Sequence, residues 1–162
     1  MKIKFTEREK QFLEQAIELS RKGMLDGYGG PFGCIIVKGD EVVGEGFNKV
    51  TSSNDPTAHA EVVAIRDACE KLGTYQLTGC EIYTSCEPCP MCLGAIYWAR
   101  PEKVFYANTK DDAAAIDFDD DFIYDEINTS MEERKILFHH CPHPLAKEVF
   151  EQWKKWGGKK LY

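Results

Sequence analysis

Residues 81 to 107 are EIYTSCEPCPMCLGAIYWARPEKVFYA, and their pattern predicts a strand, a helix and a second strand. The apolar runs at 81–84 and 104–107 have the length and composition of buried strands. Between them, Pro88 precedes a segment from Cys89 to Ala99 whose apolar residues recur at helical spacing. This part of the chain is therefore expected to form one strand–helix–strand unit of an α/β domain.

The rest of the chain continues the alternation of helices and strands. Before residue 81, the predicted elements are a helix from Thr6, strands at 33–37 and 41–47, and a helix from His59 to Leu72 that is entered through Asp55-Pro56-Thr57 as N-cap. Towards the C-terminus the pattern weakens, and we expect a last strand at 135–138 and a helix at 145–156. Together these elements predict a three-layer α/β/α sandwich, in which helices flank a mixed sheet of about five strands.

Two short motifs, His59-Ala60-Glu61 and Pro88-Cys89-Pro90-Met91-Cys92, supply one imidazole, one carboxylate and two thiols. One His and two thiolates balance Zn²⁺ and leave a tetrahedral position for water, whose pKa zinc lowers to about 7. Both motifs lie at the start of a predicted helix, where backbone N–H groups and the helix dipole favour thiolates. Glu61 is expected to carry protons rather than to bind metal. The motifs predict one catalytic Zn²⁺ per chain, bound by His59, Cys89 and Cys92.

A structural zinc site is the alternative interpretation, because Cys86, Cys89 and Cys92 are evenly spaced and a fourth protein ligand closes the coordination sphere. The protein is then a zinc-stabilised binding module without catalysis. Against this, Cys86 belongs to the preceding apolar run and points elsewhere if the helix starts at Pro88. A closed site also leaves Glu61 without a role.

Length, charge and cysteine content narrow the class of protein. A chain of 162 residues suits one well-buried domain, so we expect a single domain over 1–162. The net charge is −7 and no basic stripe is visible, which argues against a nucleic-acid partner. No apolar run long enough to span a membrane and no leader is recognised. Seven cysteines, an odd number, fit free thiols and a cytoplasmic location.

Family resemblance is carried by stretches spread over nearly the whole chain: GPFG at 30–33, TSSNDPTAHAE at 51–61, YTSCEPCPMCLGAIYW at 83–98, FDDDFIY at 118–124 and the terminal KKLY. The chain resembles the cytidine deaminase-like superfamily, whose zinc signature is His-x-Glu followed by Pro-Cys-x-x-Cys. Within it, the chain is most similar to the bacterial guanine deaminases. The resemblance implies hydrolysis of guanine, a small purine base, to xanthine and ammonia. It also implies a homodimer in which the segment at about 140–162 is swapped between subunits.

The resemblance further implies roles for single residues. The implied zinc ligands are His59, Cys89 and Cys92, with Glu61 as the proton shuttle, and the implied substrate-binding residues are Phe32, Asn48, Trp98, Asp120 and Tyr162. Asn48 and Asp120 would hydrogen-bond the base, and Phe32 and Trp98 would contact its ring. Tyr162 is expected to close the pocket. The backbone at Ala60 is expected to help orient the base.

These substrate residues also have structural interpretations. Asn48 at a strand end suits a turn cap, and Phe32 and Trp98 suit a hydrophobic core. The acidic run at 117–121 suits a solvated loop, and a terminal tyrosine is often frayed. The cluster of His139, His140, Cys141 and His143 matches no closed metal site and is expected at the surface or in a dimer contact.

Other substrates compete with guanine. The tRNA adenosine deaminases share His-Ala-Glu and Pro-Cys-x-Met-Cys and act on a flipped-out base; the acidic balance and the FDDDFIY stretch argue against this activity. Guanosine, another nucleoside or a triazine is a closer alternative to guanine. These substrates differ mainly in the size of pocket that they need, and the sequence does not give that size.

Overall fold

The computed structural model describes residues 4 to 162. The chain divides into two compact units, of which the first ends at Asp120 and the second begins at Asp121. In chain order the elements are α1 Glu7–Leu25, β1 Gly33–Lys38, β2 Glu41–Phe47, α2 Val50–Ser53, α3 Ala60–Leu72, β3 Cys80–Cys86, α4 Pro90–Ala99, β4 Lys103–Asn108, α5 Lys110–Ala114, α6 Asp121–Asn128 and α7 Pro144–Lys155. Within residues 4–162, no helix combines the length and apolar character needed to cross a bilayer.

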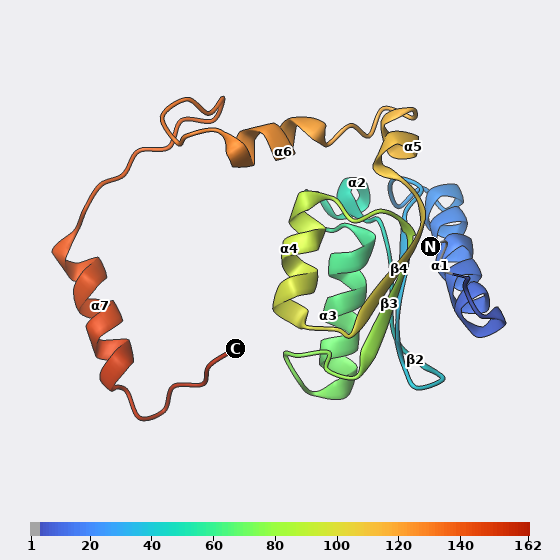
Figure 1. Ribbon diagram of the computed structural model, residues 1–162, viewed down its shortest axis with the longest axis horizontal. Coiled ribbons are helices and arrows are strands. Elements are labelled where there is room, and N and C mark those ends of the chain that lie inside the picture. Colours follow the sequence, from blue (N-terminus) through green and yellow to red (C-terminus); the bar gives the residue numbers. More distant parts are fainter. Residues whose placement is uncertain (1–3) are drawn as a thin grey trace. The chain divides into compact units, whose positions relative to one another are not determined.

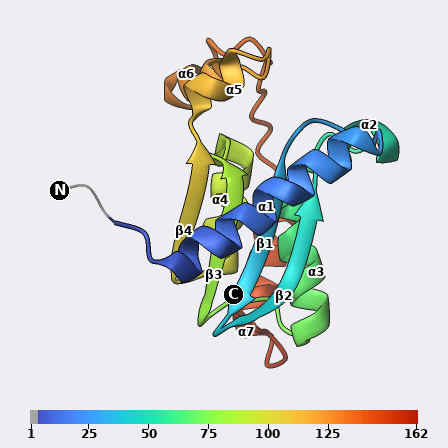
Figure 2. The same ribbon diagram turned by 90° about the vertical axis from the view of Figure 1, so that its right-hand side faces the viewer.

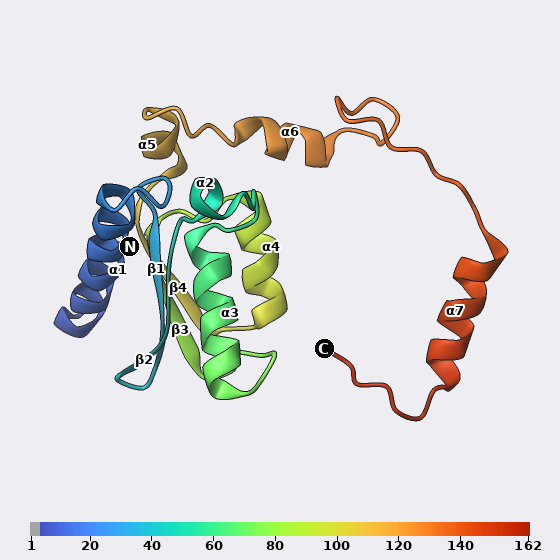
Figure 3. The same cartoon turned by 180° about the vertical axis from the view of Figure 1, so that it is seen from behind.

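The first unit is built on a mixed four-stranded sheet with the strand order β2-β1-β3-β4. Strand β1 pairs antiparallel with both β2 and β3, whereas β3 and β4 are parallel and are joined through α4. Helix α1 covers one face of the sheet, and α3 and α4 cover the other (Figures 1, 2 and 3). The predicted three-layer sandwich with a mixed sheet is confirmed.

Strand β1 separates the two halves of the core. Its side chains alternate between the faces of the sheet, as the geometry of a strand requires. Cys34 and Ile36 pack with the residues under α3 and α4, whereas Ile35 and Val37 pack with the residues under α1. A strand buried on both faces reads as a continuous apolar run, and this is why GCIIV was recognisable as a strand.

Helix α1 begins as predicted, with a capping box between Thr6 and Glu9. The Thr6 hydroxyl accepts from the Glu9 backbone, and the Glu9 carboxylate accepts from the Thr6 N–H at 2.7 Å. In the same turn, the Arg8 guanidinium donates to Glu81 at 2.8 Å and to the Tyr83 hydroxyl at 3.2 Å. The helix is thereby fixed to β3, the strand that leads into the Pro88–Cys92 motif.

The second unit, from Asp121 onward, contains α6 and α7. The predicted helix at 145–156 is present as Pro144–Lys155, and its first position is the proline, where no N–H is needed. The predicted strand at 135–138 is wrong, because these residues form bends and irregular backbone. An apolar run becomes a strand only when a neighbouring strand offers hydrogen bonds, and the sheet pairs no strand beyond β4.

Candidate metal centre and active site

The start of α3 places the first motif. Asp55-Pro56-Thr57 does not cap the helix as predicted; instead the Asp55 carboxylate accepts from the Thr57 N–H at 2.8 Å in a local turn. His59 is the N-cap, with extended backbone, and its carbonyl accepts from Val63 at 2.9 Å. The imidazole is therefore attached to the residue that directly precedes the first helical turn. Ala60 and Glu61 follow as the first two helical residues.

The start of α4 places the second motif. The helix begins at Pro90 rather than at Pro88, so Cys89 is the N-cap and Cys92 is the third helical residue. The fixed φ of proline suits the first helical position, which explains the shift. Both cysteines thus lie at the helix N-terminus, where the free N–H groups and the dipole favour a negative charge.

The three ligands predicted for zinc converge on one point. The Nδ1 atom of His59 lies 3.5 Å from the Sγ atoms of both Cys89 and Cys92, and the ligand atoms all lie within 4.8 Å of one another. Tetrahedral coordination, with Zn–N and Zn–S bonds of about 2.0 and 2.3 Å, places N and S about 3.5 Å apart. The distances and the donor set fit zinc, and three protein ligands are typical of catalytic zinc sites.

The pKa values of Cys89 and Cys92 are shifted in opposite directions. The hydrogen bond from Cys92, assisted by His59 and opposed by burial, lowers the pKa of Cys89 to about 4. The same bond with Cys89, together with burial, raises the pKa of Cys92. The bond with Cys89 also raises the pKa of His59. One thiolate therefore exists before a metal binds, and the second forms when the metal displaces a proton.

Glu61 lies beside these ligands and is almost completely buried, with 6% of its surface exposed. One carboxylate oxygen, Oε1, accepts from the Thr84 hydroxyl at 3.2 Å, and the other, Oε2, lies 3.3 Å from the Cys92 sulfur as acceptor. Burial raises the pKa of Glu61. The structure thus provides an ionisable carboxyl next to the metal ligands.

Cys86 lies outside the group of ligands. Its thiol donates to the carbonyl oxygen of Thr109 at 3.5 Å, and burial raises its pKa to about 11. The geometry therefore favours three protein ligands over the closed site with Cys86.

Asn48 is buried, and its side-chain oxygen accepts from the backbone N–H groups of Val50 at 3.1 Å and Gly30 at 3.4 Å. The turn-cap interpretation is thus correct for this oxygen. The two backbone donors also fix the orientation of the amide. What Asn48 can offer a ligand is therefore the N–H donor of Nδ2.

The aromatic residues differ in their surroundings. Phe32 is half-buried and packs edge-to-face on Phe118, with ring centroids 4.9 Å apart and an interplanar angle of 87°. Trp98 on α4 is 63% exposed, so the core interpretation is wrong for it. The ring of Phe118 also comes so close to Gly30 that a Cβ there would lie 2.9 Å from it. Glycine at 30 therefore makes room for the Phe118 ring.

Asp120 and Tyr162 belong to different units. Asp120 closes the first unit, is half-buried, and its charge contributes to the raised pKa of His59. The carboxylate therefore lies within electrostatic reach of the metal ligands. Tyr162 ends the second unit and is 68% exposed. Its role stays a prediction.

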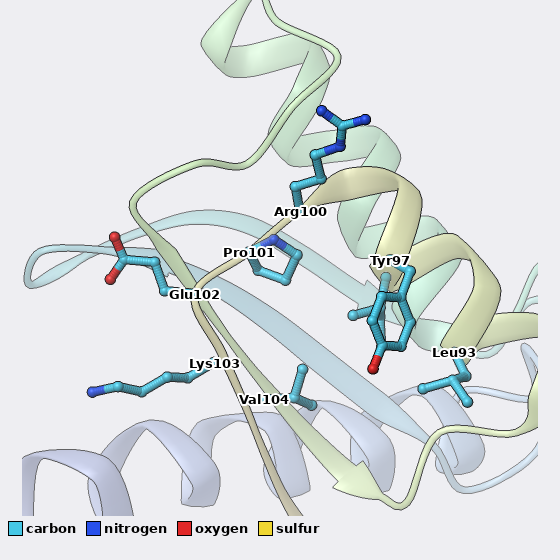
Figure 4. A pocket seen from close by; sticks show the side chains of 8 residues that line it. Leu93, Tyr97, Arg100, Pro101, Glu102, Lys103 and Val104 are labelled. Carbon is cyan, nitrogen blue, oxygen red and sulfur yellow. The ribbon is translucent and has the colours of Figure 1, made fainter. Parts of the chain in front are cut away.

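A surface pocket of about 430 Å³ lies beside the C-terminal half of α4 (Figure 4). Tyr97, Arg100 and Val104 are among its lining residues, and none of the predicted site residues lines it. Cys89 and Cys92 lie at the other end of α4. This pocket is therefore separate from the metal centre.

Comparisons with known proteins agree with the site. Residues 6–108 match the family described as the cytidine and deoxycytidylate deaminase zinc-binding region. The chain belongs to this deaminase family. The family match and the converging ligands make the protein a zinc protein, with His59, Cys89 and Cys92 as the candidate site.

Two relatives span most of this deaminase. Guanine deaminase of Bacillus subtilis (strain 168) is 56% identical over 151 residues, which cover 93% of this chain and 97% of the relative. The X-ray structure of guanine deaminase from Bacillus subtilis matches with a TM-score of 0.93 at 55% identity, covering 94% of this chain and 98% of that one. A tRNA-specific adenosine deaminase of Streptococcus pyogenes serotype M1 is 33% identical, over 90% of this chain and 85% of the relative.

Two residues near the site were not predicted from the sequence. The sequence pattern indicates Thr84 only as part of a strand and Phe118 only as part of an acidic stretch. The signal for Thr84 was a hydroxyl on the same strand face as Ile82, in a run that is otherwise buried. Phe118 gave no such signal, because its contact with Phe32 joins segments far apart in the sequence.

Proposed function

We propose that the protein is a zinc-dependent guanine deaminase, which converts guanine and water to xanthine and ammonia. The observation that carries this proposal is the buried carboxyl of Glu61, which lies next to the candidate metal site formed by His59, Cys89 and Cys92. Guanine as the substrate is supported by the likeness to Bacillus subtilis guanine deaminase over nearly the whole of both chains. The tRNA-specific relative is more distant, at 33% identity.

Glu61 is the proton carrier of the proposed reaction. When bound, zinc lowers the pKa of water to about 7 and so makes water a nucleophile for C2 of guanine at neutral pH. Glu61 takes the proton that the water releases and delivers protons to the ring nitrogen and to the leaving amine. Because burial raises its pKa, the carboxyl is suited to hold a proton between these two steps.

Five residues are proposed to recognise the base. The Nδ2 donor of Asn48 would bind an acceptor on the purine, and the Asp120 carboxylate would accept from ring N–H groups. Phe32 and Trp98 would contact the flat ring. The N–H of Ala60, in the first helical turn and outside the pattern of α3 hydrogen bonds, would help orient it.

Ammonia release from a panel of substrates tests the proposal. Guanine, guanosine, adenine, cytosine, a triazine and an anticodon stem-loop are each incubated with the zinc-loaded protein, and the Glu61→Gln variant serves as the blank. The proposal predicts the highest kcat/KM for guanine and no release from the stem-loop. Faster release from guanosine, a triazine or the stem-loop would replace guanine as the substrate.

A homodimer with swapped C-terminal segments is the second part of the proposal. Helix α7 buries none of its residues. Leu145, Val149 and Phe150 are each more than half exposed, at 62%, 58% and 73%. Exposed apolar surface of this kind usually meets a partner, and we propose that the body of a second subunit, residues 1–139, covers this surface of the 140–162 segment. The cytoplasmic location stays a prediction, which the seven free thiols support.

Mixing two inactive chains tests the swap. One chain carries Glu61→Gln with an intact C-terminal segment, and the other ends at residue 139. In a swapped dimer, the intact body of the shortened chain receives the segment of the first chain, so mixing restores activity. In an unswapped dimer each site carries either the Glu61→Gln change or the missing C-terminal segment, so the mixture stays inactive.

A further inference from the structure

The side chain of Thr84 is held rigidly in the middle of the sheet. Strand β3 lies between β1 and β4, and Thr84 pairs with Cys34 on one side and Tyr106 on the other. Its side chain is 1% exposed. Because Thr is branched at Cβ, its χ1 rotamer is restricted as well. The hydroxyl therefore occupies a well-defined position.

This hydroxyl contacts one oxygen of the Glu61 carboxylate and leaves the other oxygen turned toward the ligands. It donates to Oε1 at 3.2 Å, while Oε2 lies 3.3 Å from the Cys92 sulfur. The carbonyl of Gly33, at 3.4 Å, is a weaker second acceptor for the same hydroxyl. The two carboxylate oxygens are therefore not equivalent.

Zinc changes the balance between these two contacts. Cys92 binds zinc as a thiolate, which has no hydrogen to donate, so the bond from its sulfur to Oε2 is lost in the zinc-loaded protein. The Thr84 hydroxyl and the backbone N–H of Glu61 itself then remain as the donors to the carboxylate. Without the hydroxyl, Oε1 of the buried carboxylate loses a hydrogen bond, and the side chain is expected to rotate toward other donors.

Building on the proposed function, we propose that Thr84 is a positioning residue: its hydroxyl holds Oε1 of Glu61 so that Oε2 faces the metal site and the substrate. Oε2 is thereby the atom that carries the proton. Thr84 itself touches neither metal ligand nor base in this assignment. Its effect is on the rate of the chemical step, because proton transfer requires the carboxylate in one orientation.

Thr84→Val and Thr84→Ser separate this role from simple core packing. Valine keeps the shape and removes the hydroxyl, whereas serine keeps the hydroxyl and removes a methyl group. Thr78→Val is the matched control, since Thr78 is exposed and lies outside the site. Zinc content, melting temperature, steady-state kinetics with guanine and the crystal structure are compared among the four proteins, each loaded with zinc.

The proposal predicts that Thr84→Val binds one zinc per chain and keeps its KM within about twofold, while kcat falls by about 10- to 100-fold. Thr84→Ser restores most of kcat, and Thr78→Val matches the wild type. In crystals of Thr84→Val the Glu61 carboxylate leaves the orientation seen here.

Three results would overturn the positioning role: an unchanged kcat in Thr84→Val, an equal loss in Thr84→Ser, or an unmoved Glu61 carboxylate. Failure of the proposed function shows separately, as wild-type protein that releases no ammonia from guanine. The crystallographic comparison then still decides whether Thr84 orients Glu61.

Discussion

Gly46 lies where β2 and α3 come closest, and its substitution by alanine is expected to damage both folding and zinc binding. A Cβ at this position would lie 2.3 Å from the carbonyl oxygen of Ala60 and 2.5 Å from the backbone nitrogen of Ala64. Ordinary contacts of carbon are about 3.5 Å, so α3 must retreat by about 1 Å. The atoms in the way belong to backbone, and no side chain can turn aside to relieve the overlap.

The cost of this retreat follows from the packing of the core. Forcing a methyl group into a close-packed core costs about 1 to 3 kcal/mol. For a chain of this size, that corresponds to a fall in melting temperature of about 2 to 12 °C. Because the carbonyl of Ala60 lies next to His59, the imidazole moves away from Cys89 and Cys92, and zinc affinity is expected to fall by about tenfold or more.

Calorimetric melting and zinc titration of Gly46→Ala measure both effects. Gly94→Ala is the matched control, because Gly94 is an exposed helical residue and a Cβ there meets no atom within 4 Å, so no loss of stability is expected. A Gly46→Ala protein that melts and binds zinc like the wild type would refute the close approach of β2 to the start of α3.

Four further predictions concern the site itself. Glu61→Gln is expected to keep zinc and guanine binding while kcat falls by at least about 100-fold; near-normal turnover removes Glu61 from proton transfer. Metal analysis should find zinc in Cys86→Ser and none in Cys89→Ser, because the Cys86 thiol points to a backbone carbonyl; equal losses contradict the three-ligand site. Asn48→Asp keeps the acceptor that the backbone uses but removes the Nδ2 donor, so KM for guanine should rise by about 5- to 100-fold with little change in melting temperature; an unchanged KM contradicts the assigned contact. Since the pKa of Cys92 is raised, its thiol is protonated at neutral pH and zinc binding must release that proton, so zinc affinity should rise with pH; titration calorimetry in buffers of different ionisation heat measures the release, and a pH-independent affinity contradicts it.

The candidate zinc ligands can be found in the sequence because metal binding needs few side chains in a narrow arrangement. His59, Cys89 and Cys92 each lie at or near the start of a helix, and local capping and proline signals indicate such starts to within a few residues. Pro90 occupies the first helical position of α4, and this placed Cys89 outside the helix rather than inside it. The ligand set survives this shift, because an N-cap side chain still projects toward the helix start.

Contacts between segments far apart in the chain were beyond the sequence pattern. The bond between Thr84 and Glu61 depends on how β3 packs against α3, and the contact of Phe32 with Phe118 joins the start of β1 to the residues after α5. At residues 135–138, in contrast, the sequence pattern predicts an element that the structure does not contain. Their apolar side chains suggested a strand, yet a strand also needs a hydrogen-bonding neighbour, and composition does not show one.

The number of sulfur atoms bound to zinc decides whether the metal keeps a position open for water. X-ray absorption spectroscopy of the zinc-loaded protein is expected to find two sulfur donors at about 2.3 Å and two lighter donors at about 2.0 to 2.1 Å. The lighter donors are His59 and one ligand that the protein does not supply. A third sulfur, from Cys86, would show a site closed by the protein and would contradict the hydrolytic role.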